Sequence, residues 1–149
     1  SRNERMTEFS ALLGRIQLEK LDIFLGKRRK IALAYKERLQ NSNFFSLILP
    51  DEIEQTSCWK IPLILRSNID RNFILAKLNE KKIFADKAYD PPLHLQPVMK
   101  KIFSTHKGQL PISEAILSQN ICLPSHQKMS MNDVDYVCEN LIQITKNFK

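Results

Sequence analysis

The sequence predicts an α+β fold, an α/β sandwich in which helices cover a small, mainly antiparallel sheet of three or four strands. Residues 3–40 contain no proline and place apolar residues at steps of three and four, which is typical of a helix that buries one stripe. Short apolar runs bounded by turn residues, such as 58–66, are typical of strands. Further helical patterns alternate with these runs, and such alternation favours a sheet covered by helices.

Residues 3–40 are expected to form a long N-terminal helix. Thr7 is suited to cap its first turn, because a threonine hydroxyl accepts a hydrogen bond from an exposed backbone N–H. Thirty-odd helical residues would extend roughly 45–50 Å, which exceeds the width of a compact domain of this size. We therefore expect the helix either to kink near residues 22–26 or to project beyond the core and require another surface to cover it.

The rest of the chain divides into short elements. Strands are expected at 44–49, 58–66, 83–85 and 121–123, and helices at 70–78, 98–103, 112–118 and from 131 onward. Asp70 is a suitable N-cap for the second helix, and Pro111 suits the first turn of the fourth. Pro62 indicates that one side of its strand is an edge or a bulge, because proline donates no hydrogen bond. The three prolines within 89–97 predict a stiff, extended loop.

The chain has the size of one domain, at 149 residues, and a formal net charge of +7. That charge permits binding to nucleic acid or to an anionic surface. The densest basic run, 27–30, lies inside a helical pattern and is interpreted as a solvated helix face. The spacings of zinc fingers and of RNA-recognition motifs are absent. Composition leaves a helix-turn-helix open.

The cysteines and histidines do not form a pattern of metal ligands. Cys58, Cys122 and Cys138 are far apart and include no CxxC pair, so we expect reduced thiols in the core of a cytoplasmic protein. The three histidines are 12 and 20 residues apart, and we expect no metal site. No apolar run approaches the ~20 residues of a membrane span, and the first residues lack the apolar core of a signal peptide. We therefore expect no membrane partner.

Three collinear stretches carry a resemblance to a known family. The first contains Asn3, Arg5, Met6 and Thr7, the second is 89–97, and the third runs from Leu123 through Tyr136. Together they resemble the DegT/DnrJ/EryC1/StrS aminotransferases, pyridoxal-phosphate (PLP) enzymes that aminate keto-sugars, mostly nucleotide-linked, and some cyclitols. The resemblance covers nearly the whole chain. It implies the small domain of a fold-type I aminotransferase.

The resemblance also implies that the PLP-binding part of such an enzyme is not in this sequence. The family's Schiff-base lysine stands near a Gly-Glu-Gly-Gly stretch, whereas this chain has three glycines, none near another. We therefore expect residues 1–40 to be an interdomain helical segment and 41–149 the C-terminal small domain. The parent would be a homodimeric, cytoplasmic PLP-dependent aminotransferase of cell-surface polysaccharide or secondary-metabolite biosynthesis, transferring an amino group from glutamate to a keto-sugar. The fragment alone is expected to bind no PLP and to be inactive.

The resemblance assigns roles to four residues. Asn3 corresponds to an asparagine that contacts the cofactor phosphate of the neighbouring subunit. Arg5 corresponds to an arginine whose guanidinium suits the diphosphate of a nucleotide-sugar. Tyr89 and His94 are expected to border the sugar site. Position 88 is alanine, where many nucleotide-sugar members have histidine, and Lys87 is a candidate to replace some of that positive charge.

Other interpretations stay open for the same residues. Asn3 and Arg5 also fit solvated positions at the start of a helix, and a lone histidine such as His94 is commonly structural. His106 is expected at the surface and His126 in a turn. No residue is predicted to be catalytic. The rival functions are a basic regulatory or nucleic-acid-binding module built on the first helix, and a protein-interaction module.

Overall fold

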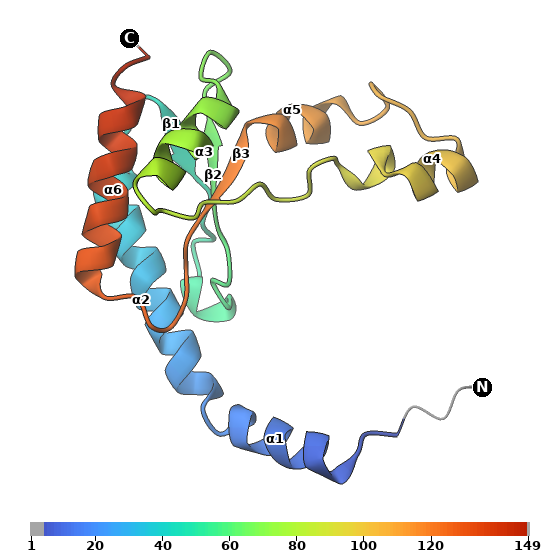
Figure 1. Ribbon diagram of the computed structural model, residues 1–149, viewed down its shortest axis with the longest axis vertical. Helices are drawn as coiled ribbons and strands as arrows, with labels where there is room; N and C mark the ends of the chain where they lie inside the picture. The colour runs from blue at the N-terminus through green and yellow to red at the C-terminus, as the bar shows by residue number, and fades with distance from the viewer. Residues whose placement is uncertain (1–4, 149) are drawn as a thin grey trace.

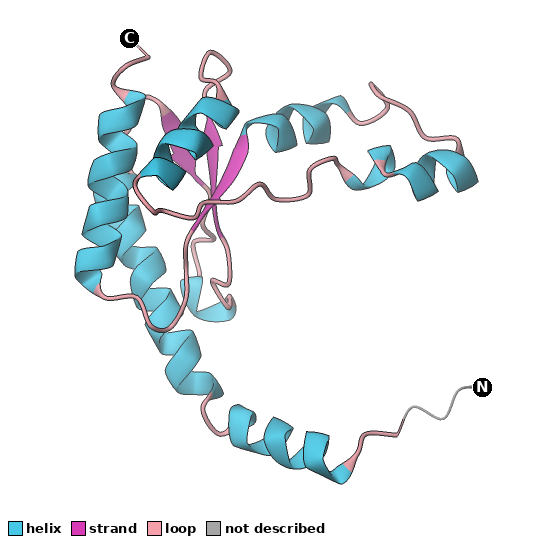
Figure 2. Ribbon diagram, viewed as in Figure 1, coloured by secondary structure: helices cyan, strands magenta, loops and turns pink. Residues whose placement is uncertain are grey.

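The computed structural model describes residues 5–148 and confirms the predicted α+β class. The helices are α1 (Glu8–Leu18), α2 (Leu21–Leu39), α3 (Arg71–Glu80), α4 (Pro97–Phe103), α5 (Pro111–Gln119) and α6 (Met131–Thr145). The strands are β1 (Phe45–Leu47), β2 (Ile61–Leu65) and β3 (Asn120–Leu123), with single 3-10 turns at Ile53–Gln55 and Leu93–Leu95. Figure 2 shows the three strands as one small sheet flanked by helices.

The sheet is antiparallel with β2 in its centre, in the order β1-β2-β3. Alternate residues of β2 point to opposite faces, so Ile61, Leu63 and Leu65 are buried while Pro62 and Ile64 are half-buried. Ile48 donates to the Pro62 oxygen at 2.9 Å. Proline has no N–H with which to complete that pair, and β1 ends at the preceding residue. β2 is nevertheless the central strand and not an edge, so the expected edge or bulge at Pro62 is limited to the end of β1 beside it.

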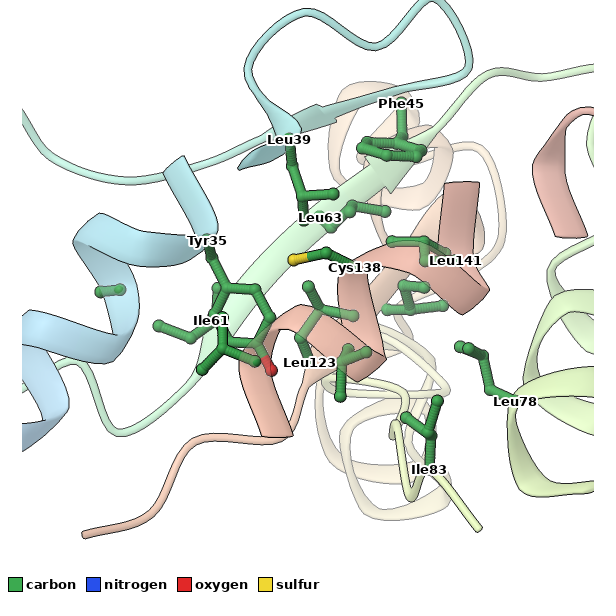
Figure 3. Packing of buried hydrophobic residues seen from close by; sticks show 14 of the residues in the cluster. Tyr35, Leu39, Phe45, Ile61, Leu63, Leu78, Ile83, Leu123, Cys138 and Leu141 are labelled. Atoms are coloured by element: carbon green, nitrogen blue, oxygen red, sulfur yellow. The ribbon is translucent and has the colours of Figure 1, made fainter. Parts of the chain in front are cut away.

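The core lies between the sheet and three helices, α2, α3 and α6 (Figures 1 and 3). Its largest completely buried side chain is Tyr35 of α2, which packs among residues of β2, β3 and α6. The Tyr35 hydroxyl donates to the Pro124 carbonyl at 3.0 Å, so the buried polar atom has a partner. Arg38 and Asp135 form an ion pair between α2 and α6. The second half of α2 thus belongs to the same core as the residues after 40.

The predicted N-terminal helix is divided in two. α1 ends at Leu18 and α2 begins at Leu21, so the break lies just before the predicted range 22–26. Thr7 caps α1 as expected, accepting from the Ser10 N–H at 3.2 Å. No residue of α1 is buried, and Figure 1 shows this helix projecting beyond the core from the N-terminal end of α2. Both parts of the expectation, a change of direction and a projecting helix, are therefore observed.

Most of the other predicted elements are confirmed, with one correction. Asp70 caps α3 by accepting from the Asn72 N–H at 2.8 Å, and α6 begins with a capping box of Ser130 and Asp133. The strand predicted at 83–85 was wrong. The Ile83 N–H donates to Leu78 O in the last turn of α3, so this segment completes the end of a helix, and only the following residue bridges to the sheet.

A second projection is formed by α4 and α5, with α5 next to β3 and α4 further from the sheet (Figure 1). Neither helix contains a buried residue. Exposed apolar side chains on and around these helices are Leu93, Val98, Ile102, Phe103, Leu110, Ile112 and Ile116. Within residues 5–148, no helix combines the length and apolar character that crossing a bilayer requires.

Candidate functional site

The loop that follows residue 85 is fixed to the edge strand β3. Asp86 and Cys122 exchange two backbone hydrogen bonds, of 3.1 Å and 2.7 Å. Two residues later, the Ala88 N–H donates to the Oδ1 atom of the buried Asn120 at 3.2 Å. A buried amide oxygen facing a buried N–H satisfies both groups. The backbone leading to Tyr89 is therefore held against the sheet.

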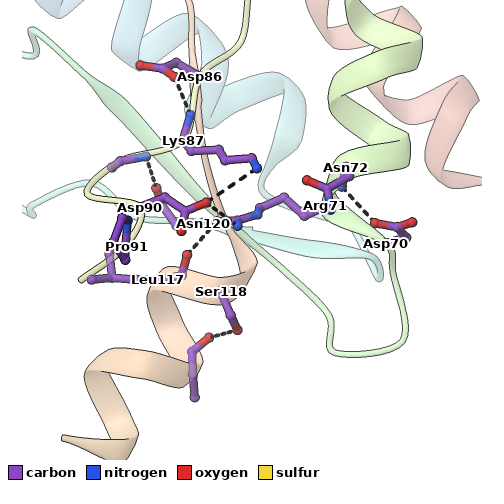
Figure 4. A network of polar contacts seen from close by, with 12 residues as sticks. Asp70, Arg71, Asn72, Asp86, Lys87, Asp90, Pro91, Leu117, Ser118 and Asn120 are labelled. Atoms are coloured by element: carbon purple, nitrogen blue, oxygen red, sulfur yellow. Dashed lines mark hydrogen bonds and ion pairs between the residues drawn. The ribbon is translucent and has the colours of Figure 1, made fainter. Parts of the chain in front are cut away.

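An ion-pair network fixes the other side of Tyr89 (Figure 4). Asp90 Oδ2 lies 2.8 Å from Arg71 Nη2 and 3.4 Å from Lys87 Nζ. Arg71 also donates to the Leu117 carbonyl at 2.7 Å. Lys87 is thus paired with an aspartate of its own loop, so its charge is partly neutralised. Lys87, the candidate from the sequence to supply positive charge near residue 88, thus pairs with Asp90.

Tyr89 opens onto a groove of about 350 Å³ on the side of the sheet opposite the core. The groove is lined by Ile48, Leu49, Pro50, Thr56, Cys58, Trp59, Lys60, Pro62, Ala88, Tyr89 and Cys122. Segments from before β2, from the Tyr89 loop and from β3 therefore meet there. Its walls are mainly apolar, with Trp59 and Tyr89 largely exposed.

Lys60 is the only charged residue in this lining. Its Nζ atom lies 5.1 Å from the centre of the Trp59 ring and 5.9 Å from that of Tyr89. Both distances are in the range in which an ammonium group is attracted to an aromatic face. The ammonium is therefore held between two rings at the groove.

Two groove residues have an unusual backbone. Cys58 and Tyr89 have φ values of 45° and 54°, in the left-handed region that disfavours side chains with a Cβ. Such conformations persist where the surroundings impose them, and they gather at functional sites. Here Asn120 and Arg71 fix the residues on either side of Tyr89. Ser125 Oγ donates to the Cys58 carbonyl at 2.9 Å.

His94 does not face the groove with Tyr89. It is 7% exposed, and its Nε2 atom lies 3.0 Å from Glu114 Oε1 at the start of α5. Glu114 also accepts from the backbone N–H of Gly108 at 2.8 Å. The hydrogen bond from His94, followed by those from Gly108 and Leu110, lowers the pKa of Glu114. His94 thus joins the proline loop to the α4–α5 projection.

The two predicted N-terminal residues lie far along the chain from this groove. Arg5 is exposed, in the segment before α1, and is not part of the groove lining. Asn3 lies outside the described residues. His106 is exposed as expected, and His126 stabilises a turn, its Nδ1 accepting from the Lys128 N–H at 3.3 Å.

Sequence reasoning did not identify Trp59 and Lys60 as site residues. They were included in the predicted strand 58–66, but β2 begins only at Ile61. The available signal was that the only tryptophan of the chain stands beside a lysine. Their approach to Tyr89, thirty residues later, depends on tertiary structure.

The three thiols are free and buried, as the sequence predicted. Burial raises the pKa of Cys58 and of Cys122, and the nearby Lys60 ammonium opposes the shift at Cys122. Burial raises the pKa of Cys138 to about 12. Thiols with raised pKa values are poor nucleophiles, so the two groove cysteines contribute shape and apolar surface.

A larger cavity, of about 750 Å³, lies between the end of α3 and the first turns of α6. It is lined by Lys81, Lys82, Ile83, Phe84, Pro124, Ser125, His126, Met129, Asp133, Tyr136 and Val137. The Asp133 carboxylate accepts from the Ser130 N–H and hydroxyl, and the Tyr136 hydroxyl donates to Lys81 O. Asp133 and Tyr136 thus have partners within the fold.

The groove can contact a polar ligand, but it does not form a PLP site by itself. Tyr89 offers a hydroxyl and Lys60 an ammonium, while Trp59 offers an apolar face that suits a sugar or a base. A PLP site needs a Schiff-base lysine, a carboxylate and a phosphate cradle. The lining includes no carboxylate and no glycine. The described residues therefore fit a substrate-binding wall rather than a cofactor site.

Known proteins resemble this chain in sequence and in fold. The model of the DegT/DnrJ/EryC1/StrS aminotransferase family matches residues 1–142. An uncharacterized protein of Methanocaldococcus jannaschii is 32% identical over 87% of this chain, and the GDP-perosamine synthase of Escherichia coli O157:H7 is 29% identical over 93%. The solved structure of PseC, an aminotransferase of Helicobacter pylori involved in pseudoaminic acid biosynthesis, shares the fold with a TM-score of 0.87 at 22% identity over 99% of the chain. The chain spans 34%, 36% and 39% of these three proteins.

Proposed function

Because the chain belongs to the DegT/DnrJ/EryC1/StrS aminotransferase family, we propose that it is the C-terminal small domain of a PLP-dependent enzyme that transfers an amino group to a keto-sugar. The family is PLP-dependent, and curated relatives are named as nucleotide-sugar transaminases. Glutamate is the proposed amino donor, and polysaccharide or secondary-metabolite synthesis the proposed context. The keto-sugar is proposed to be nucleotide-linked.

The observation that carries this proposal is the groove at Tyr89. The Tyr89 hydroxyl, the Lys60 ammonium and the Trp59 indole all line it. The loop that carries Tyr89 is fixed on both sides of this residue. Fixed polar groups on a mainly apolar surface are what a sugar-binding wall requires. We propose that Tyr89 contacts the sugar and that His94 acts by positioning the loop through Glu114.

We propose that the two projections meet the rest of the protein. Phe9 of α1 is 78% exposed and Ile112 of α5 is 76% exposed, and both belong to helices without a buried residue. Apolar faces of this extent mark interaction surfaces. The roles proposed for Asn3 at the cofactor phosphate of a neighbouring subunit, and for Arg5 at a diphosphate, require this assembly. A homodimer and a cytoplasmic location are proposed with it, the latter because the three thiols are free.

The nucleic-acid-binding alternative has less support from the basic run at 27–30. Arg28 and Arg29 are half-buried, and Arg29 donates to the Thr56 carbonyl at 3.0 Å. One of the four cations thus has a structural partner. Binding to nucleic acid that falls steeply with salt would favour the alternative.

The test uses the protein that contains this chain together with the part that its relatives have in addition. The enzyme is supplied with PLP, glutamate and a panel of nucleotide-linked keto-sugars and keto-cyclitols. Amino-sugar and 2-oxoglutarate are measured by mass spectrometry. We expect turnover with a keto-sugar and none with the 149-residue chain alone.

Paired tyrosine variants locate the site. Tyr89→Phe removes the groove hydroxyl and is expected to lower kcat/KM roughly tenfold, as for loss of one hydrogen bond of about 1.5 kcal/mol. Tyr136→Phe removes a hydroxyl that is used only at the end of α3 and is expected to leave turnover unchanged. Equal effects of the two changes, or a folded protein that forms no amine, would contradict the proposal.

A further inference from the structure

Lys60 carries a positive charge that nothing around the groove neutralises. None of the ion pairs of the described residues includes Lys60, and the groove lining contains no aspartate or glutamate. On the adjoining loop, the Asp90 carboxylate is paired with Arg71 and Lys87. The walls thus present an isolated cation in mainly apolar surroundings.

The position of the ammonium is restricted by its two aromatic neighbours. Attraction to the faces of Trp59 and Tyr89 holds the end of an otherwise flexible side chain, without using a carboxylate. Tyr89 is itself fixed by the Asn120 and Arg71 contacts on either side of it. A lysine whose charge is held in place and left unpaired loses less conformational freedom when it binds an anion.

The two loop residues before Tyr89 offer no free charge to the groove. Ala88 is buried, at 6% exposure, with its N–H bonded to Asn120, so its side chain offers no contact with a substrate charge. Lys87 is paired with Asp90. The cation available to a ligand in this groove is therefore Lys60, which reaches it from the segment before β2.

We propose that Lys60, flanked by Trp59 and Tyr89, binds the phosphate or diphosphate that is linked to the sugar substrate. This inference rests on the proposed function and adds to it a groove residue that binds the charged part of the nucleotide-linked substrate. An ammonium provides three donors for phosphate oxygens, and the low polarity of the walls strengthens their attraction. The exposed face of Trp59 then lies beside the sugar or base attached to that phosphate.

The experiment uses Trp59, the only tryptophan of the chain, as a fluorescent reporter beside the proposed site. The 149-residue chain is titrated with pyrophosphate, with UDP and with uridine at low ionic strength. We expect the Trp59 fluorescence to change saturably with pyrophosphate and with UDP, and UDP to bind with the higher affinity. Uridine is expected to cause no change. The affinity for the two anions is expected to fall as salt is added, because the contact is between charges.

Matched lysine variants decide whether Lys60 is responsible. Lys60→Met removes the charge, Lys60→Arg keeps it, and Lys100→Met removes a charge from the exposed surface of α4. Loss of one charge-assisted hydrogen bond is expected to weaken binding about tenfold or more in Lys60→Met. Lys60→Arg and Lys100→Met are expected to retain binding. Circular dichroism verifies that each variant is folded.

The inference is overturned if uridine changes the fluorescence as much as UDP does. It is equally overturned if the anions produce no change, or if Lys60→Met binds them like Lys100→Met. These outcomes are separate from those of the transamination assay. Amine formation from a sugar without phosphate, with no anion binding, would retain the proposed function and remove the role of Lys60. Anion binding without amine formation would do the reverse.

Discussion

The Nη2 atom of Arg71, in the first turn of α3, lies 2.8 Å from Oδ2 of Asp90, the residue that follows Tyr89. The arginine side chain is 12% exposed and also donates to the Leu117 carbonyl at the end of α5. One guanidinium thus connects α3, α5 and the groove loop (Figure 4). Because it is planar with several donors, a lysine could not make both contacts in the same geometry.

Arg71→Met is expected to loosen the Tyr89 loop more than the core. The change removes a hydrogen bond to a charged partner and one to a carbonyl, and we expect it to lower the free energy of unfolding by about 1–2 kcal/mol. Urea denaturation measures the loss, and amide hydrogen exchange at Tyr89 reports the loop. Lys77→Met breaks the exposed pair with Glu80 and should cost less than ~0.5 kcal/mol. Equal losses in the two variants would argue against a special role for Arg71.

The contact between His94 and Glu114 predicts a dependence of stability on pH. Since the pKa of Glu114 is lowered in the folded state, mainly by His94, its contribution is complete above the pKa of an unfolded glutamate, about 4.3. That contribution disappears as the pH falls through the lowered value. The free energy of unfolding, measured by urea denaturation between pH 3 and 7, should therefore fall less steeply toward acid pH in Glu114→Gln than in the unchanged chain. NMR titration should show the Glu114 pKa rising in His94→Leu, which has no donor at this position, and an unchanged value would exclude the contact.

The three thiols are expected to resist alkylation in the folded protein. Cys138 has a pKa of about 12, so at pH 8 its thiolate fraction is lower than that of a free cysteine by roughly a thousandfold. Mass spectrometry after iodoacetamide treatment should find no rapid labelling in the native state and three labels in urea. Ser67→Cys places a thiol at an exposed position and should label quickly. Rapid native labelling at Cys58 or Cys122 would mean that the groove is more open than described.

The exposed face of α1 is expected to influence association without affecting folding. Phe9, Leu12 and Ile16 are exposed, and no residue of α1 is buried in the 149-residue chain. Replacing all three by glutamine should change the free energy of unfolding by at most about 0.5 kcal/mol. Light scattering should show less self-association in the variant than in the parent chain. A large loss of stability would mean that α1 packs on the core.

Local patterns in the sequence were sufficient to predict most of the helices and two of their caps. Thr7 and Asp70 act through groups two or three residues away, so their roles are visible in a short window of sequence. The apolar stripe of α6 is similarly local, and it includes the buried residues Val134, Cys138 and Leu141. The segment 83–85 misled because an apolar run also occurs where a helix ends and its N–H groups bond backwards to the last turn.

The candidate site was only partly predictable, because several of its contacts join residues far apart in the chain. The proline loop was identified through its resemblance to a family, and Tyr89 does line a groove. The position of Lys60 between two rings, and the pairing of His94 with Glu114, join residues 20 or more apart in the chain. Such contacts are set by the packing of separate elements, and no local periodicity encodes them.

The proline in the central strand has a consequence for the shape of this surface. Pro62 accepts from Ile48 but cannot donate to it, the first strand ends at Leu47, and the following residues Leu49 and Pro50 line one side of the Tyr89 groove. The absent N–H of Pro62 thus stands where the pairing of the two strands ends and the ligand-sized groove begins. Substituting an amino acid that restores the donor, as in Pro62→Val, would extend the ladder and narrow the opening.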